Sequence, residues 1–78
     1  MGKTFERQPD GSYLLSRGVY AYRSGRRWVV LTTDDGLRFE TADPDGGAYT
    51  GGEKTVLDWA HGWGRKYRTL ADAAASIG

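Results

Sequence analysis

The chain of 78 residues contains no cysteine and only one histidine, His61. Without cysteine it can form neither a disulfide nor a thiolate metal site, and a single histidine cannot build a histidine-based one. No apolar run approaches the roughly 20 residues of a membrane span, and the chain shows no signal-peptide or lipidation pattern. We therefore expect a soluble, cytoplasmic protein with no cofactor, no metal and no membrane partner.

An excess of either charge is also missing, because 11 basic residues face 10 acidic ones and leave a net charge of +1. Dedicated nucleic-acid binders are usually visibly basic, so this balance argues against that class. The length allows one small domain, residues 1–78, with a modest core. The apolar share of 38% and the aromatic share of 13% are typical of a folded chain.

Strand signals dominate the first half of the chain. Arg27–Thr33 is the strongest, since its apolar centre is β-branched, and we expect a central strand with one face on the core. The Asp-Asp-Gly sequence at 34–36 predicts a hairpin, and Asp-Gly at 10–11 predicts a turn that ends a loose N-terminus over residues 1–12. The other expected strands are Tyr13–Ser16, Val19–Tyr22, Leu37–Thr41 and a short one within Gly64–Arg68.

Residues 42–52 contain four glycines, one proline and two aspartates, which predicts a glycine-rich loop. The end of this segment is similar to a phosphate-binding P-loop, but Glu53 stands where that motif needs its lysine. A calcium loop beginning at Asp43 fails as well, because its sixth position holds Ala48 and its twelfth holds Lys54, instead of Gly and Glu. We therefore interpret the segment as a surface loop.

Two later segments show helical spacing. Residues 53–61 favour a short helix that stops near Gly62, while alternation along the same residues fits a strand equally well. Near the C-terminus, Thr69 followed by Asp72 has the form of a capping box and predicts the start of a second helix. The apolar stripe of that helix consists of Leu70, Ala73, Ala74 and Ile77.

Together these elements predict an α+β fold. We expect an antiparallel sheet of three to five strands with the C-terminal helix packed on one face, and a second short helix near residues 53–61. A helix of about eight residues cannot persist alone, so it must pack on the sheet. The expected core residues are Leu15, Val19, Val29, Leu31, Leu37, Phe39, Leu70, Ala73, Ala74 and Ile77.

Residues suited to catalysis are scarce. No serine stands in a nucleophile elbow and no thiol is present, so we expect no enzymatic activity. Aromatic residues, by contrast, exceed what one small core needs and alternate with arginines. Tyr, Trp and Arg are enriched at protein interfaces and also stack on bases and pair with phosphates, while the simplest interpretation is that the rings fill the core. The candidate partner-binding residues are Tyr20, Tyr22, Arg23, Arg27, Trp28, Trp59, Trp63, Arg65, Tyr67 and Arg68.

Three pieces of the chain carry a resemblance. They are Arg17-Gly18-Val19, Gly-Arg-Arg-Trp-Val-Val at 25–30 and Tyr-Arg-Thr-Leu-Ala-Asp-Ala-Ala at 67–74. Together they resemble the plant-type AP2 domain and the three-stranded DNA-binding domains at the N-terminus of some phage and transposon integrases. That resemblance implies a three-stranded sheet on a helix, whose readers of the DNA major groove are Arg17, Arg23, Arg27 and Trp28. The preference for Arg over Lys, and for Gly and Ala, also resembles small proteins of GC-rich actinobacteria and their phages.

We therefore predict a small, non-enzymatic interaction protein, encoded by a phage or mobile element, that binds a host protein. Self-association into a homodimer is a variant of this hypothesis. The alternative is a DNA-binding module that uses an arginine and aromatic sheet face in the AP2-like manner. A DNA-binding face requires the acidic turns at 34–35 and 43–45 to point away from Arg23, Arg26 and Arg27.

Overall fold

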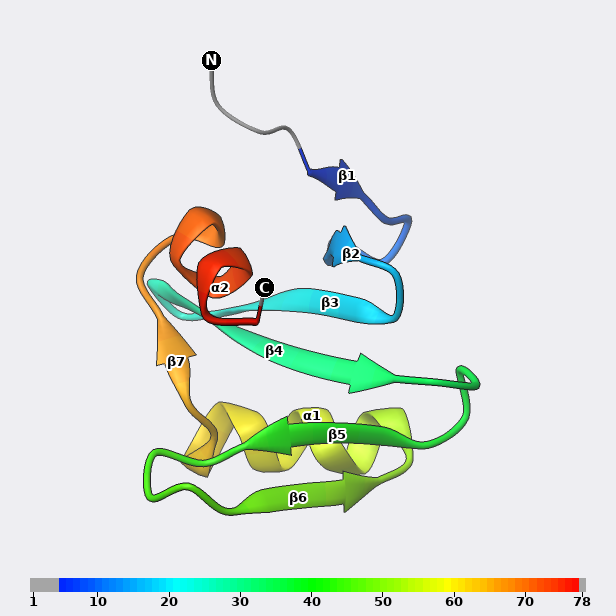
Figure 1. The fold of residues 1–78 in the computed structure, drawn as a ribbon, viewed down its shortest axis with the longest axis vertical. Coiled ribbons are helices and arrows are strands. Elements are labelled where there is room, and N and C mark those ends of the chain that lie inside the picture. The colour runs from blue at the N-terminus through cyan, green and yellow to red at the C-terminus, as the bar shows by residue number, and fades with distance from the viewer. Residues whose placement is uncertain (1–4, 78) are drawn as a thin grey trace.

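The structure, a computed structural model, describes residues 5–77 and confirms the α+β class. One antiparallel sheet carries two helices, one of them C-terminal (Figure 1). The sheet has seven strands instead of three to five, because short strands also form at 6–7 and 48–51. The elements are β1 (Glu6–Arg7), β2 (Tyr13–Ser16), β3 (Val19–Ser24), β4 (Arg27–Thr33), β5 (Phe39–Ala42), β6 (Ala48–Gly51), α1 (Glu53–Trp63), β7 (Lys66–Tyr67) and α2 (Leu70–Ile77).

The sheet is a meander from β1 to β6, and β7 returns to its centre. The C-terminal half of β4 pairs with β5, with Thr33 opposite Phe39. The N-terminal half of β4 pairs with β7, with Trp28 opposite Tyr67. Strand β4 therefore has β3 along one side and two shorter strands along the other (Figure 1).

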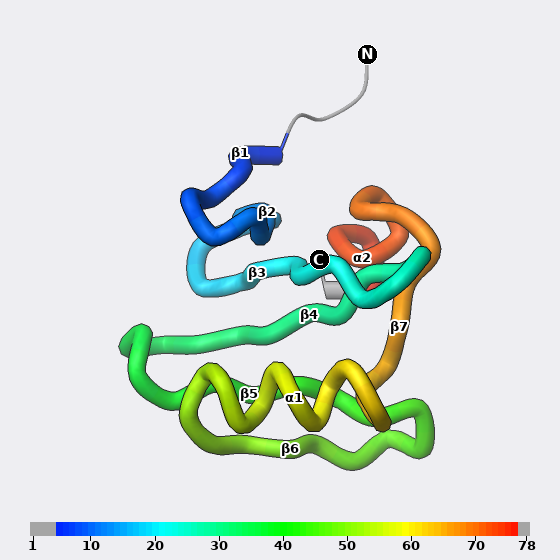
Figure 2. The backbone as a smooth tube through the Cα atoms, turned by 180° about the vertical axis from the view of Figure 1, so that it is seen from behind, coloured from blue at the N-terminus to red at the C-terminus, as the bar shows by residue number. Residues whose placement is uncertain are grey.

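The two helices cover opposite faces of the sheet, as the front and back views show (Figures 1 and 2). Because side chains alternate along a strand, Val29 and Leu31 of β4 pack toward α1, while Val30 packs toward α2. This explains the continuous apolar centre of β4. The expectation that only one of its faces is buried is wrong, since both faces are covered.

Each face has its own hydrophobic cluster. We call the cluster under α1 the α1-side core and the cluster under α2 the α2-side core. The α1-side core consists of Tyr22, Val29, Leu31, Phe39, Val56 and Ala60. The α2-side core consists of Leu15, Val19, Ala21, Val30 and Ala73.

Six of the ten expected core residues are buried in these clusters, and two more, Leu70 and Ala74, are half-buried against the α2-side core. The prediction that Leu37 belongs to the core is wrong. Its side chain is 79% exposed, because Leu37 lies in the loop before β5 and not on the strand. The side chain of Ile77 lies outside the described part of the chain.

The expectation of a loose N-terminus over residues 1–12 is wrong for residues 5–12, and residues 1–4 lie outside the described part. Strand β1 pairs with β2, with Arg7 opposite Tyr13. The carboxylate of Asp10 accepts hydrogen bonds from the backbone N–H of Ser12, at 2.9 Å, and from its hydroxyl, at 2.6 Å. These local bonds close the predicted turn and hold β1 on the sheet.

The glycine-rich loop is shorter than the predicted span of 42–52. Residue 42 ends β5 and residues 48–51 form β6, so only residues 43–47 make a turn. Asp43 Oδ1 accepts hydrogen bonds from the N–H groups of Asp45 and Gly47, at 2.9 and 2.7 Å. This Asx-type turn reverses the chain tightly enough for the following residues to pair with β5.

The segment after the loop is helical, as favoured, but α1 runs through Gly62 and ends at Trp63. The stop is Gly64, where a Cβ atom would lie 2.7 Å from the Cα of Ala60. The Lys66 ammonium donates hydrogen bonds to the carbonyls of Ala60 and Gly64 at this helix end, and the Ala60 carbonyl also accepts the backbone N–H of Gly64. Neither helix in residues 5–77 is long and apolar enough to span a membrane.

The predicted cap of α2 is confirmed. The backbone N–H of Asp72 donates to the Thr69 hydroxyl at 3.0 Å. Strand β7 delivers Thr69 to the α2 face directly after its pairing with β4, so the cap fixes where α2 begins on that face.

Candidate functional site

The ten candidate residues lie on different surfaces of the molecule. Arg23, Trp28 and Tyr67 form one row across β3, β4 and β7, because Trp28 is paired with both of the others. The Arg23 guanidinium lies 5.1 Å from the centroid of the Trp28 ring, and Tyr13 meets the same ring edge-on at 5.5 Å. Trp28 and Tyr67 pack against the α2-side core, so these rings contribute mainly to the fold and Arg23 supplies the exposed group of the row.

Tyr20, Tyr22 and Arg27 lie on the opposite face, with α1. Tyr22 is buried in the α1-side core, and its hydroxyl donates a hydrogen bond to Glu53 Oε2 at 2.6 Å. Burial and the neighbouring Glu53 carboxylate raise the pKa of Tyr22 above its ordinary value. Tyr22 is therefore a neutral donor that joins β3 to the first turn of α1, and its hydroxyl is already occupied.

The other two aromatic candidates, Trp59 and Trp63, lie one turn apart on α1. The Trp59 ring stacks on Tyr49 of β6, with ring centroids 4.9 Å apart and planes 3° apart. Trp63 is 72% exposed. Both tryptophans line an open hollow of about 410 Å³ whose other wall is the turn over residues 43–45. We call Tyr49, Trp59 and Trp63 the aromatic ledge.

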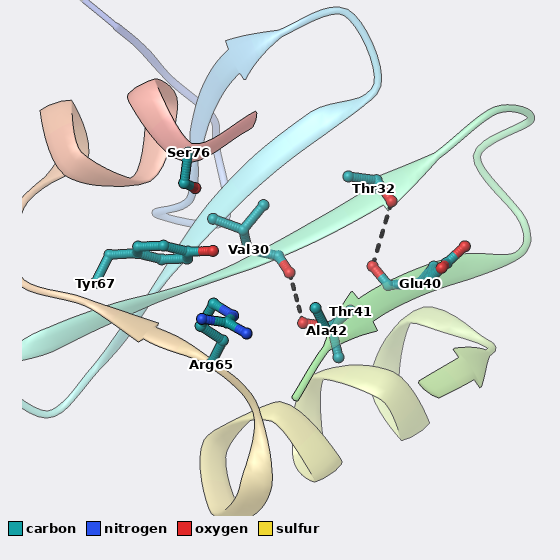
Figure 3. A pocket seen from close by; sticks show the side chains of 8 residues that line it. All are labelled: Val30, Thr32, Glu40, Thr41, Ala42, Arg65, Tyr67 and Ser76. Atoms are coloured by element: carbon teal, nitrogen blue, oxygen red, sulfur yellow. Dashed lines mark hydrogen bonds between the residues drawn. The ribbon is translucent and has the colours of Figure 1, made fainter. Parts of the chain in front are cut away.

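Arg65 lines a second hollow of about 300 Å³, on the α2 face (Figure 3). The Arg65 guanidinium donates to the backbone carbonyls of Asp43 and Pro44, at 3.1 and 3.3 Å, so it holds the acidic turn in place. In the same hollow, the buried hydroxyl of Thr41 donates to the Val30 carbonyl at 2.7 Å. The polar groups of this second hollow are largely committed to the fold.

Four exposed arginines gather at the tip of the β3–β4 hairpin. Arg23, Arg26 and Arg27 flank its turn, and Arg68 follows β7, which is paired beside it (Figure 1). None of the four forms an ion pair with a carboxylate in residues 5–77. We call these residues the arginine tip.

The two acidic turns lie at opposite ends of the sheet. Residues 34–35 follow β4 at the end remote from the arginine tip. The turn over residues 43–47 lies at the same end as the tip, with β7 between them (Figure 1). Residues 34–35 thus point away from the arginine tip. The turn over residues 43–47 flanks the tip and is separated from it by strand β7.

Two contributors to these surfaces were not among the candidates. Tyr49 lies in the segment that we interpreted as a loop. The alternation of small and aromatic residues at 48–51 is the one signal by which a strand could have been predicted there. Tyr13 was assigned to a strand, but its contact with Trp28 depends on pairing between β2 and β3 and on the register of β3 with β4. Cross-strand contacts of this kind are absent from any local pattern.

Carboxylates in the described residues mostly serve turns. Hydrogen bonds from the side chain and backbone of Ser12 lower the pKa of Asp10, and hydrogen bonds from the backbone N–H groups of Arg38 and Leu37 lower the pKa of Asp35. Within residues 5–77, no three His, Asp or Glu side chains are grouped so that they could hold a metal ion. The aromatic ledge and the arginine tip, by contrast, offer exposed side chains to a partner.

No family model matches the chain, and no curated protein or solved structure matches it either. The AP2-like resemblance stays a prediction. Its three pieces do fall on adjacent elements, since they include the start of β3, the first half of β4 and β7 with α2. However, α1 covers the other face of β4, where that architecture implies an open sheet.

Proposed function

We propose that this protein is a non-enzymatic interaction protein that binds another protein through the aromatic ledge, with a phage or mobile element as its source and a host protein as the expected class of partner. The observation that carries the proposal is Trp63. Its indole is 72% exposed beside the stacked pair of Trp59 and Tyr49. Large aromatic side chains at the centre of a surface hollow are the residues that most often dominate the binding energy of protein interfaces.

The surroundings of the ledge support the same proposal. The hollow is rimmed by the turn over residues 43–45, so an apolar floor borders two carboxylates. Protein interfaces commonly combine an apolar centre with a polar rim. The ledge is rigid for a surface feature, because Tyr49 is fixed by pairing with Thr41 and Trp59 is stacked on Tyr49. A rigid ledge loses little conformational entropy when a partner covers it.

The test is capture from a bacterial lysate on the immobilised protein, followed by titration of the captured protein. Trp63→Ala should weaken binding at least tenfold, as expected for a central aromatic residue. Leu37→Ala is the matched control, because Leu37 is equally apolar and exposed but lies in the loop before β5. Equal affinity of Trp63→Ala and the unaltered protein for everything captured would overturn the proposal.

The arginine tip favours a second candidate function, binding to the phosphate backbone of DNA. Its four guanidinium groups are exposed without carboxylate partners, and residues 34–35 lie at the other end of the sheet. Binding to a mixed-sequence duplex should then weaken steeply with salt. Arg27→Ala should reduce the salt slope by about one unit, while Arg38→Ala, at the remote end, should leave it unchanged. Absence of binding at about 50 mM salt would remove this candidate.

A further inference from the structure

Strand β6 is an edge of the sheet that nothing covers within residues 5–77. It is paired with β5 on one side only, and its outer N–H and C=O groups face away from the sheet. Its sequence, Ala-Tyr-Thr-Gly, has no charged residue and no proline. Natural proteins usually protect an edge strand with Lys, Pro, a bulge or a covering loop, because an open edge pairs with another strand. The opposite edge strand, β1, is only two residues long and charged at both positions.

The aromatic ledge lies beside this open edge. Helix α1 packs against β4, β5 and β6, so it is centred on β5, and Trp59 reaches from it to Tyr49 on β6. Trp63 continues the same flank one turn later, and between the two lies Gly62, whose missing side chain leaves open space. An apolar flank and an unprotected strand edge thus form one continuous surface.

The spacing of the elements indicates what fits this surface. If a second β6 paired antiparallel with the first, the symmetry axis would be perpendicular to the sheet, and both α1 helices would lie on the same face. Three strand spacings of about 4.8 Å would separate the two β5 strands, so the helices would be about 14 Å apart. Close-packed helices are about 8 to 10 Å apart. Large side chains on the facing flanks are needed to fill that gap, and Trp59 and Trp63 are placed to do so.

Charge along the edge is complementary under the same symmetry. Asp45 precedes β6, and Lys54 follows it in the first turn of α1; both are exposed. The carboxylate of Asp43 already accepts backbone hydrogen bonds, whereas that of Asp45 has no partner in residues 5–77. Antiparallel pairing brings the beginning of one β6 to the end of the other, and therefore Asp45 of one copy toward Lys54 of the second copy.

We propose that the occupant of the aromatic ledge is a second copy of this chain, joined by antiparallel β6–β6 pairing with the two α1 flanks facing each other. This inference rests on the protein-binding role proposed above, and it names a second copy of the chain, in place of a host protein, as the partner at the ledge. It accounts for an open strand edge and two adjacent surface tryptophans with a single contact.

Analytical ultracentrifugation of the full chain over about two decades of concentration tests the inference. We expect a concentration-dependent dimer. Trp63→Ala should raise the dissociation constant at least tenfold, and Leu37→Ala should not change it. Asp45→Lys and Lys54→Asp should each weaken the dimer, and the double variant Asp45→Lys/Lys54→Asp should restore it, which only an interface that joins these two positions would do.

A sedimentation coefficient of the monomer at every concentration would overturn the inference. If Trp63-dependent capture of a different protein persisted in that case, the proposed protein-binding function would stand. A dimer that is insensitive to Trp63→Ala, or one that the double charge reversal fails to restore, would also overturn the arrangement. Circular dichroism of each variant would show that the fold is retained, because all of the altered side chains are exposed.

Discussion

The α1-side and α2-side cores lie on the same sheet but are built differently. The three largest fully buried side chains, Leu31, Val29 and Val56, all belong to the α1-side core. In the α2-side core the two fully buried residues are alanines, Ala21 and Ala73. The larger residues that pack against the α2-side core are only half-buried.

The difference follows from the helices themselves. Each helix contacts three strands, but α1 has 11 residues and α2 has only eight. A short helix covers little surface, and alanine on both elements lets α2 come close enough to the sheet to exclude water. Most of the hydrophobic stabilisation should therefore come from the α1 side. The α2 side still contains an open hollow, to which Val30 contributes (Figure 3).

Shortening two adjacent valines of β4 that face opposite sides of the sheet tests this difference between the two cores most directly. Val29→Ala should lower the free energy of unfolding by about 2 to 3 kcal/mol, because the side chain is fully buried and leaves a cavity. Val30→Ala should cost about 1 kcal/mol less, since Val30 borders the hollow and has fewer neighbours to lose. Urea unfolding measures both. Equal losses, or a larger loss for Val30→Ala, would contradict the comparison.

Tyr22→Phe removes the side-chain hydrogen bond that joins helix α1 to strand β3. The variant should be about 1 to 2 kcal/mol less stable at neutral pH, because the Glu53 carboxylate loses the hydroxyl that donates to it. The pKa of Tyr22 is raised in the folded protein, so the unfolded chain ionises first. Stability should therefore fall as the pH rises above about 10, and part of that fall should be missing in Tyr22→Phe.

The control for this prediction is Tyr20→Phe. Tyr20 lies on the same face, and its hydroxyl forms no hydrogen bond in residues 5–77. Urea unfolding at pH 7 and pH 11 should show little change at neutral pH for this variant. An alkaline fall in stability that is the same in Tyr22→Phe and the unaltered protein would rule out the role assigned to Tyr22.

Thr69→Ala tests the start of α2. The variant loses the side chain that accepts the Asp72 N–H, and it should be destabilised by about 1 kcal/mol. Thr55→Ala, in the exposed first part of α1, makes no such bond and should be neutral or slightly stabilising. Thermal unfolding of the two variants compares them directly, and a neutral Thr69→Ala would show that α2 is held by packing alone.

The smallest expected effect is an increase in stability from a substitution at the start of α1. Its N-cap, Gly52, has extended backbone angles (φ −70°, ψ 158°) and no side-chain cap, and a Cβ there would meet nothing within 4 Å. Gly52→Ser should supply the missing acceptor and stabilise the protein by about 0.5 kcal/mol. A higher urea midpoint with an unchanged slope is the expected result, and any loss of stability would contradict it.

Much of the fold was predictable because its signals are local. The limits of β2 and β4, the helical segment after residue 52 and the Thr69 cap were each expected from neighbouring residues. Strands β1 and β6 were missed, since their short polar or glycine-rich sequences become strands only when β2 and β5 offer them partners. Leu37 was misplaced because alternation with Phe39 marks a strand face but does not say where the strand begins.

The candidate surface was predictable only as a list of residue types. In the sequence Tyr22, Trp28 and Trp63 are equivalent, as aromatic residues near arginine or glycine. In the structure Tyr22 belongs to the α1-side core, Trp28 is half-buried and Trp63 is exposed. Tyr49, which completes the ledge, was missed because its stacking on Trp59 joins two elements that are separated by a turn into the helix.

Signals that lie within a few residues of one another specify three features: the β-branched centre of β4, the turn at Asp10-Gly11 and the cap at Thr69. These depend on backbone propensity and local hydrogen bonds, which act in any context. The tertiary structure decided that both faces of β4 are covered, that β7 separates the arginine tip from one acidic turn, and that Trp59 and Trp63 lie beside an open edge. The physical reason is that strand pairing and burial join residues far apart in the chain, so no local pattern contains them.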